Sequence, residues 1–225
     1  PKKLKSSGGP ITQDNTGVEY YSTLFSASES KINNKELWVA SDDGLVYLTR
    51  NMGESWENIT PIQAPKFLMY NSLETSSFNS EKAYLAGTIY KTGDFSPYLY
   101  KTTDYGKSWK KIVNGIPDEH FTRVLREDPS KEGLLYAGTE YGIYVSYDDG
   151  ESWNFFQKNL PRVPITDIKI KDNSLIVATQ GRGIWILDDL TVLHQLNKKI
   201  INDEINLFKP KNSYRVNGSG GLSSK

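Results

Sequence analysis

The sequence predicts an all-β fold built from propeller blades, and two observations carry this prediction. An octapeptide occurs three times, beginning at Thr49, Thr102 and Ser146, so that its copies start 53 and 44 residues apart. This spacing lies within or near the period of about 40 to 50 residues that marks propeller blades among repeat proteins. Short runs of β-branched and aromatic residues, bounded by turn residues, recur around each copy. One repeat unit therefore corresponds to one blade of four antiparallel strands.

The strands of each unit are predicted from these runs, because the segments between them are rich in the residues that turns prefer. First strands are expected near residues 20–26, 68–77, 121–127 and 165–171. Second strands are expected at 36–40, 83–88, 134–139 and 174–179, and third strands at 45–49, 98–102, 142–146 and 183–187. Fourth strands begin at the tryptophan of the octapeptide, at residues 56–59, 109–112 and 153–156.

The fourth unit ends differently, because no Gly-x-Ser-Trp follows Asp188 and Asp189. Residues 191–196 are expected to form a short helical turn, and residues 205–208 are expected to supply a replacement fourth strand. Terminal repeats are atypical because they cap or close an array, so we interpret this unit as a C-terminal blade.

The chain divides into four blades between two linkers. The predicted boundaries are a lead-in segment at 1–17, blades at 18–60, 61–113, 114–160 and 161–210, and an exit linker at 211–225. Four blades is the lower limit for a closed propeller, since propellers usually carry about four to eight. Both ends have a linker-like composition and the chain starts at Pro1. We therefore expect these blades to complete a larger propeller of about seven blades that begins upstream.

The octapeptide has the pattern Ser/Thr-x-Asp/Asn-x-Gly-x-Ser-Trp, and each recurring residue type has a physical role in a turn. The acid or amide accepts hydrogen bonds from turn amides, glycine supplies a positive φ, and tryptophan buries a large ring between neighbouring sheets. Because Asn51 replaces the acid in the first copy, a catalytic or metal-binding role shared by all three copies is disfavoured. The residues assigned this structural role are Asn51, Gly53, Trp56, Asp104, Gly106, Trp109, Asp148, Gly150 and Trp153.

This pattern resembles the Asp-box, or BNR repeat, of the sialidase, sortilin and xyloglucanase β-propellers. Three further motifs resemble a family of large bacterial sortilin-like proteins that are often labelled as glycosyl hydrolases: Gly-Gly-Pro-Ile-Thr at 8–12, Ala-Thr-Gln-Gly-Arg-Gly-Ile-Trp-Ile-Leu-Asp-Asp at 178–189 and Leu-Phe-Lys-Pro at 207–210. The resemblance covers nearly the whole chain. It implies that upstream blades of the same propeller are partners of this segment. It also implies an exported bacterial protein that is periplasmic, associated with the outer membrane or secreted.

Composition disfavours several classes of function. The chain of 225 residues has 27 basic and 27 acidic side chains, so its formal net charge is zero. Nucleic-acid-binding domains usually carry an excess of basic residues, and this chain has no such excess. No apolar run approaches the roughly 20 residues of a transmembrane helix, so membrane insertion is not expected. Cysteine is absent, which removes disulfides and thiolate chemistry. No phosphate-binding glycine loop and no zinc or EF-hand spacing occurs, so neither a cofactor nor a metal is expected.

The turns between second and third strands are expected to meet on the face opposite the octapeptides, where propellers usually bind ligands. Their carboxylates, arginine and aromatic rings suit a sugar or a peptide terminus. Ordinary turn chemistry stays open as the alternative, because tight hairpins prefer the same residues. Arg182 is expected either to pair with a carboxylate such as Asp188 or to anchor a ligand. The predicted ligand-binding rim consists of Asp43, Glu140, Tyr141 and Arg182.

Catalytic signals are weaker than the scaffold signals. A sialidase needs an arginine cluster, and its Arg-Ile-Pro signature is absent. A xyloglucanase-like enzyme needs two carboxylates across a cleft, about 6.5 to 9.5 Å apart if it inverts. His120 is expected to be a lone exposed side chain, and His194 a packed one. The candidate catalytic acids are Asp42, Asp43, Asp94 and Glu140.

Two hypotheses about function follow. The first is a non-catalytic module that binds a protein, a peptide or a glycan within a larger exported bacterial protein. It is suggested because several motifs predict the propeller scaffold and no complete catalytic motif is present. The second is a glycoside hydrolase whose acid and base are shared with upstream blades. It rests on the acidic rim and on the label of the family, and a fold alone does not settle function.

Overall fold

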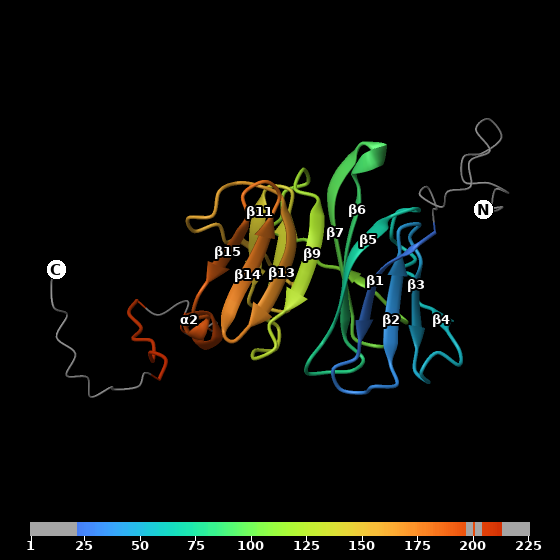
Figure 1. Ribbon diagram of the computed structural model, residues 1–225, viewed down its shortest axis with the longest axis horizontal. Coiled ribbons are helices and arrows are strands. Elements are labelled where there is room, and N and C mark those ends of the chain that lie inside the picture. Colours follow the sequence, from blue (N-terminus) through green and yellow to red (C-terminus); the bar gives the residue numbers. More distant parts are fainter. Residues whose placement is uncertain (1–21, 197–199, 201–203, 213–225) are drawn as a thin grey trace, which may run out of the picture.

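The computed structural model describes residues 22–196, 200 and 204–212. Four antiparallel sheets lie side by side in chain order, with the first sheet at one end of the array and the last sheet with its helix at the other (Figure 1). Three sheets have four strands and the last has three, and neighbouring strands in each sheet are consecutive in the chain. This meander is the topology of a propeller blade, so the predicted fold class is confirmed.

Each blade is a short sheet joined by tight turns. Blade 1 contains β1 (Leu24–Glu29), β2 (Leu37–Ser41), β3 (Val46–Thr49) and β4 (Glu57–Asn58). Blade 2 contains β5 (Met69–Thr75), β6 (Ala83–Ile89), the 3-10 helix η1 (Tyr90–Thr92), β7 (Asp94–Thr102) and β8 (Lys110–Lys111). Blade 3 contains β9 (Thr122–Glu127), β10 (Leu135–Thr139), β11 (Gly142–Ser146) and β12 (Asn154–Phe155). Blade 4 contains β13 (Ile165–Lys171), β14 (Ser174–Thr179) and β15 (Ile184–Leu187), followed by helix α2 (Thr191–Gln195).

The main departure from the expected strands is in blade 4, where residues 205–208 do not form the predicted fourth strand. Ile205 and Leu207 are instead 91% and 96% exposed. Helix α2 follows β15 in place of a fourth strand. The Gln195 side chain then holds the backbone of Lys209 through two hydrogen bonds, of 2.8 Å to the carbonyl and 2.9 Å from the amide. The outer edge of β15 therefore stays unpaired among the described residues.

Each fourth strand has only two residues instead of the predicted four, and the bounds of β1 and β7 also differ from the expected ones. β1 runs later than the predicted 20–26, because its register with β2 pairs Glu29 with Leu37 at the far end. β7 begins at Asp94 rather than at residue 98, since η1 brings Asp94 back beside Ile89 of β6. The predicted lead-in segment 1–17 lies outside the described residues, as does most of the exit linker, of which 211–212 are described.

The hydrophobic core lies between the sheets rather than within any one of them. One buried cluster joins blades 1 and 2 and contains Trp38, Leu68 and Tyr100. Equivalent clusters join blade 2 to blade 3 and blade 3 to blade 4. Because burying apolar surface is the main favourable term in folding, each blade depends on its neighbour for stability.

The three octapeptides adopt one hydrogen-bonding scheme. In blade 2 the Thr102 hydroxyl donates to Asp104 Oδ1 at 2.7 Å and accepts the Gly106 amide at 2.8 Å. Asp104 Oδ1 also accepts the amide of Ser108 at 2.9 Å. In the first copy Asn51 Oδ1 keeps these acceptor roles. Its Nδ2 donates to the hydroxyl of Ser55. In the other two copies the direction is reversed, and the serine hydroxyl donates to the aspartate.

Each internal octapeptide also contacts the preceding blade. The indole Nε1 of Trp109 donates to the Ile59 carbonyl at 2.7 Å, and that of Trp153 donates to the Ile112 carbonyl at 2.8 Å. Gly106 has φ +79°, and a Cβ placed on it would lie 2.7 Å from the Ile59 Cβ. Glycine is therefore required here both for the left-handed backbone and for the close approach of the neighbouring blade.

The first octapeptide lacks this inter-blade contact in the described part of the chain. Trp56 occupies the same position as the other two tryptophans, yet its ring is 44% exposed, whereas that of Trp109 is 9% exposed. The surface around Trp56 combines this exposed indole with mostly polar side chains such as Glu36 and Arg50, and no described blade lies against it.

Candidate functional site

An aromatic pocket that also contains polar side chains lies on blade 3, on the face opposite the octapeptides. It has a volume of about 180 Å³ and is lined by His120, Tyr141, Tyr144, Phe155 and Arg162. Tyr141 lies in the turn between β10 and β11, and the histidine and arginine come from the loops before β9 and after β12. We call this site the blade 3 pocket.

Strand register brings the walls of the blade 3 pocket together. Tyr144 of β11 pairs directly with Phe155 of β12, and their rings meet edge to face with centroids 5.2 Å apart. The β10–β11 turn projects Tyr141 outward because its amide donates to the Thr139 hydroxyl at 3.1 Å and Gly142 follows with φ +143°. Such a tight turn on a rigid hairpin presents a side chain with little conformational freedom.

His120 connects two of these rings. Its imidazole stacks on Tyr141 with centroids 4.6 Å apart, and its Nδ1 is 2.7 Å from the Tyr144 hydroxyl. The guanidinium of Arg162 lies over the Phe155 ring, 5.6 Å from its centroid. The prediction that His120 is a lone exposed side chain is wrong, because a loop distant in sequence packs it against the hairpin.

The electrostatics of the pocket favour a neutral imidazole beside a fixed positive charge. Burial lowers the pKa of His120 from its ordinary value of 6.5, and the nearby Arg162 lowers it further, while Glu119 acts in the opposite direction. Burial also raises the pKa of the Tyr144 hydroxyl. In the described part of the chain the arginines that form ion pairs are Arg50, Arg123 and Arg126, so Arg162 has none there.

Glu140, a predicted rim residue, lies beside the pocket but is already paired. Its Oε2 accepts hydrogen bonds from Arg123, at 2.7 Å from Nε and 2.6 Å from Nη2. The Arg123 guanidinium in turn lies over the Phe121 ring at 5.1 Å, and that ring stacks on Tyr90 at the same distance. This ion pair, in which one carboxylate oxygen accepts from two guanidinium nitrogens, holds the base of the turn that carries Tyr141.

The other predicted acids are engaged in their own turns. Asp43 accepts a hydrogen bond from the Ser41 hydroxyl, and Asp42 accepts the backbone amide of Thr23 at 2.8 Å. Burial raises the pKa of Asp94. Hydrogen bonds from the Tyr98 hydroxyl and the Ser96 amide together have a larger opposite effect, so the pKa of Asp94 lies below its ordinary value. A general acid needs a raised pKa, so this environment does not suit Asp94 for that role.

Arg182 lies apart from the blade 3 pocket, in the β14–β15 turn of blade 4. Its side chain is exposed and forms no ion pair with Asp188 or another described acid. Its backbone carbonyl accepts the indole N–H of Trp185 at 3.0 Å. The structure thus brings Glu140 and Tyr141 together but leaves Asp43 and Arg182 on the turns of other blades.

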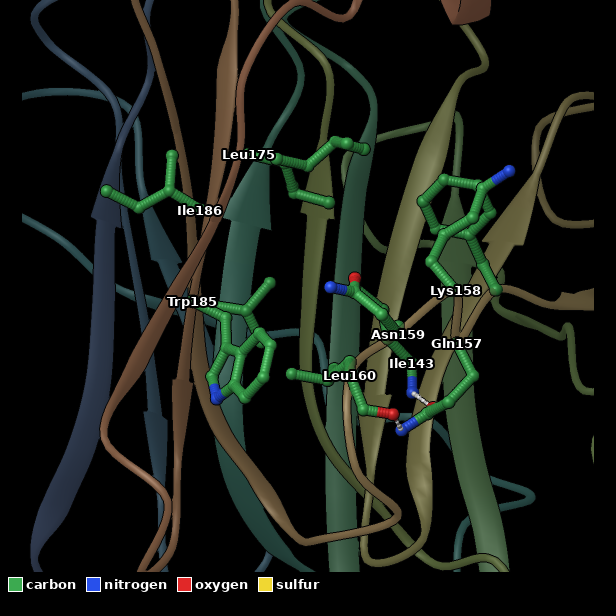
Figure 2. Close-up of a pocket in the computed structure, with 11 residues that line it drawn as sticks. Ile143, Gln157, Lys158, Asn159, Leu160, Leu175, Trp185 and Ile186 are labelled. Atoms are coloured by element: carbon green, nitrogen blue, oxygen red, sulfur yellow. Dashed lines mark hydrogen bonds between the residues drawn. The ribbon is translucent and has the colours of Figure 1, made fainter.

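A second cavity separates these two blades and is lined mainly by apolar side chains. Figure 2 shows the Trp185 indole beside Leu160, with Gln157 hydrogen-bonded to Ile143 and to the Leu160 carbonyl. Its volume of about 60 Å³ corresponds to about two water molecules at roughly 30 Å³ each. This cavity is therefore a packing gap between blades rather than a ligand site.

The described residues contain no group of three or more His, Asp or Glu side chains placed to hold a metal ion. Within the same residues, no helix has the length and apolar character needed to cross a membrane.

Comparison with known proteins places the chain among sortilin-like and xyloglucanase-like propellers. The family model described as sortilin, neurotensin receptor 3 (Sortilin-Vps10) matches residues 44–183. The oligoxyloglucan-reducing end-specific xyloglucanase of Emericella nidulans is 28% identical over 110 residues, which is 46% of this chain and 13% of the relative. Xyloglucanase Xgh74A of Acetivibrio thermocellus is 25% identical over 132 residues, which is 52% of this chain and 16% of the relative. The matched stretch is thus a small part of each relative.

Solved structures show the same fold at lower identity. The GH74 enzyme of Niastella koreensis aligns with TM-score 0.58 and 15% identity over 75% of this chain and 28% of its own. The structure described as YCF48 bound to D1 peptide aligns with TM-score 0.57 and 19% identity over 74% of this chain and 52% of its own. An extracellular domain from B. thetaiotaomicron aligns with TM-score 0.54 and 18% identity over 82% of this chain and 22% of its own. These likenesses establish a partial propeller.

Proposed function

The chain belongs to the Sortilin-Vps10 family, and from this premise we propose that it is a non-catalytic propeller module that binds a ligand within a larger exported bacterial protein. The observation that carries the proposal is the blade 3 pocket, which offers aromatic walls and one arginine without an ion pair to any described residue, but no carboxylate in its lining. Pockets that are mostly aromatic, with a few polar groups, are typical of ligand binding. Catalysis by glycosidases requires two free carboxylates instead.

The engagement of the candidate acids supports binding over hydrolysis. Glu140 is held by Arg123, and Asp94 accepts two hydrogen bonds that lower its pKa. Tyr141, by contrast, is 46% exposed at the mouth of the blade 3 pocket. The proposed binding rim is therefore centred on blade 3, and Asp43 and Arg182 extend it over the turns of the neighbouring blades.

The proposed ligands are inferred from the related proteins, and the proposed partner blades from the exposed side chain of Trp56 on blade 1. One structural neighbour is described with a bound D1 peptide, and the curated relatives are named for action on xyloglucan. A protein, a peptide or a glycan is therefore the proposed ligand class. Upstream blades of the same propeller are the proposed partners at Trp56, whose ring is exposed at the end of the array. We also propose that the three octapeptides are Asp-boxes, which their shared hydrogen-bonding scheme supports.

The proposed location is extracytoplasmic, in the periplasm, at the outer membrane or outside a bacterial cell. Two observations support it. One structural neighbour is described as an extracellular domain, and the curated relatives are polysaccharide-degrading enzymes by name. Fractionation of the native host, followed by immunodetection of the protein, tests this location.

A glycoside hydrolase is the second candidate function, because both curated relatives are xyloglucanases. In that case an acid of this rim acts with a carboxylate from an upstream blade. Replacement of Asp42, Asp43, Asp94 and Glu140 by the corresponding amides tests the role of these residues. If the full-length protein hydrolyses xyloglucan and this amide variant does not, the module contributes catalytic acids and the binding proposal is wrong.

The binding proposal is tested by titrating the full-length protein with a panel of glycans and peptides. We expect saturable binding that is lost in Tyr141→Ala and Phe155→Ala and retained in Met52→Ala, which removes an exposed side chain on the octapeptide face. Equal binding by all three variants would place the ligand elsewhere on the molecule.

A further inference from the structure

The geometry points to a carboxylated sugar residue as the ligand of the blade 3 pocket, with Arg162 pairing the carboxylate and Tyr141 and Phe155 contacting the sugar ring. This inference rests on the proposed binding function and specifies its ligand chemistry. Uronates and sialates share this chemistry, because each carries a carboxylate on a pyranose ring.

The size of the pocket fits one sugar residue. Its volume is about 180 Å³. A single pyranose ring with its substituents fills such a space, whereas an oligosaccharide must extend beyond it over the rim. The Tyr141 and Phe155 rings are 46% and 43% exposed, so each offers surface to the apolar face of a sugar.

The charge of the pocket calls for an anion. Arg162 forms no ion pair with a described carboxylate, and no acid lines the pocket. Glu140, beside Tyr141, is already committed to Arg123, whose Nε and Nη2 both contact its Oε2. The Arg162 guanidinium lies over the Phe155 ring, 5.6 Å from its centroid, and donates no hydrogen bond to another described residue. Arginine binds carboxylates through such a planar fork of donors.

The neutral polar groups of the pocket suit hydroxyls. His120 uses Nδ1 to contact the Tyr144 hydroxyl, and its Nε2 has no protein partner in the described part of the chain. The His120 ring is held by stacking on Tyr141, and the Tyr144 ring by an edge-to-face contact with Phe155. Side chains that are fixed before binding lose little conformational entropy when the ligand arrives.

Backbone hydrogen bonding at the pocket disfavours a peptide that adds as a strand. The Tyr141 amide is used by the Thr139 hydroxyl, and the Ile143 amide by the Gln157 side chain. Peptides that augment a sheet need free main-chain donors and acceptors along its edge. Recognition in the blade 3 pocket therefore depends on side chains, as it does for sugars.

The test uses isothermal titration calorimetry of the full-length protein with trigalacturonate, its methyl ester and 3′-sialyllactose. We expect trigalacturonate or sialyllactose to bind, and the neutral ester to bind at least about tenfold more weakly, because the charge-assisted pair is lost. The two acidic ligands distinguish a uronate from a sialate. Arg162→Gln is expected to weaken acidic-ligand binding by about tenfold or more, and Arg162→Lys by less, because lysine keeps the charge and loses the fork.

The matched control is Arg50→Gln, which removes one arginine from the octapeptide turn of blade 1. It should leave binding of the acidic ligand unchanged, and thermal melts should show all variants folded. Equal binding of the ester and the acid, or full affinity in Arg162→Gln, would overturn the carboxylate assignment and leave the binding module intact. Binding of peptides with no binding of either acidic sugar would also overturn it. Hydrolysis of xyloglucan by acids of the rim would reject the proposed function itself.

Discussion

The inter-blade indole hydrogen bond leads to a quantitative prediction about stability. Trp109 is the last residue of the blade 2 octapeptide, is 9% exposed, and donates from Nε1 to the Ile59 carbonyl of blade 1 at 2.7 Å. Trp109→Ala removes both the ring and this bond. Truncation of a buried tryptophan costs about 3 to 5 kcal/mol of the free energy of unfolding, since it loses transfer energy and leaves a cavity.

A second variant separates the ring from the hydrogen bond. Trp109→Phe keeps most of the apolar area but leaves the Ile59 carbonyl without its described donor. An unsatisfied buried polar group costs about 1 to 3 kcal/mol. A change of about 1 kcal/mol moves the melting temperature of a domain of this size by roughly 2 to 4 °C. The expected losses are thus about 6 to 20 °C for Trp109→Ala and about 2 to 12 °C for Trp109→Phe.

The assay is thermal and urea unfolding of the 225-residue chain, followed by circular dichroism. Trp56→Ala is the matched control, because Trp56 holds the same octapeptide position and is 44% exposed. We expect it to cost about 1 kcal/mol, the average for a point substitution. If Trp109→Ala unfolds no more readily than Trp56→Ala, the indole does not hold blades 1 and 2 together and the reasoning is refuted.

Three further predictions concern the turns and the blade 3 pocket. Gly106→Ala should cost about 2 to 4 kcal/mol, because its Cβ meets the neighbouring blade at φ +79°, whereas Gly93→Ala, at φ +89° in open space, should cost only about 1 to 2 kcal/mol in unfolding assays. Asn51→Asp should change stability by less than about 0.5 kcal/mol in a melt, since the serine hydroxyl can donate to the new oxygen as in the other copies. His120 has a pKa below 6.5, so the stability that its neutral form contributes is present above about pH 6.5 and is lost as the pH falls. Removal of the Arg162 charge by substitution with glutamine should raise this pKa in an NMR titration, and an unchanged value would contradict the assigned cause.

Local sequence was sufficient for the blades because their signals are local. The octapeptide closes its turn through hydrogen bonds between residues two and four apart, as in the contacts of Asp104 with Thr102 and Ser108. The alternation of strands and turns around it likewise needs no distant partner. The predicted strand at 205–208 does not form. A strand needs the edge of a neighbouring strand for pairing, and the backbone of Lys209 instead forms hydrogen bonds with the Gln195 side chain.

The blade 3 pocket was only partly predictable. Tyr141 could be placed on the rim because a tight turn precedes β11, but the loops that carry His120 and Arg162 lie outside any repeat motif. A possible signal was the aromatic pair of β11 and β12, since Tyr144 and Phe155 fall opposite each other once the hairpin register is set. The histidine and the arginine had no such signal, because their positions depend on loop paths.

The sequence alone was enough for the fold class, the blade order and the turn chemistry, because a repeat restates the same short-range interactions in each unit. Tertiary packing decided the rest. Between blades it buried Trp109 and left Trp56 exposed at identical motif positions. Within blade 3 it paired Glu140 with Arg123 and left Arg162 without an ion pair among the described residues. These outcomes depend on which side chains from distant segments come into contact in the folded protein. Neither the spacing of the motifs nor the composition of the chain specifies those contacts.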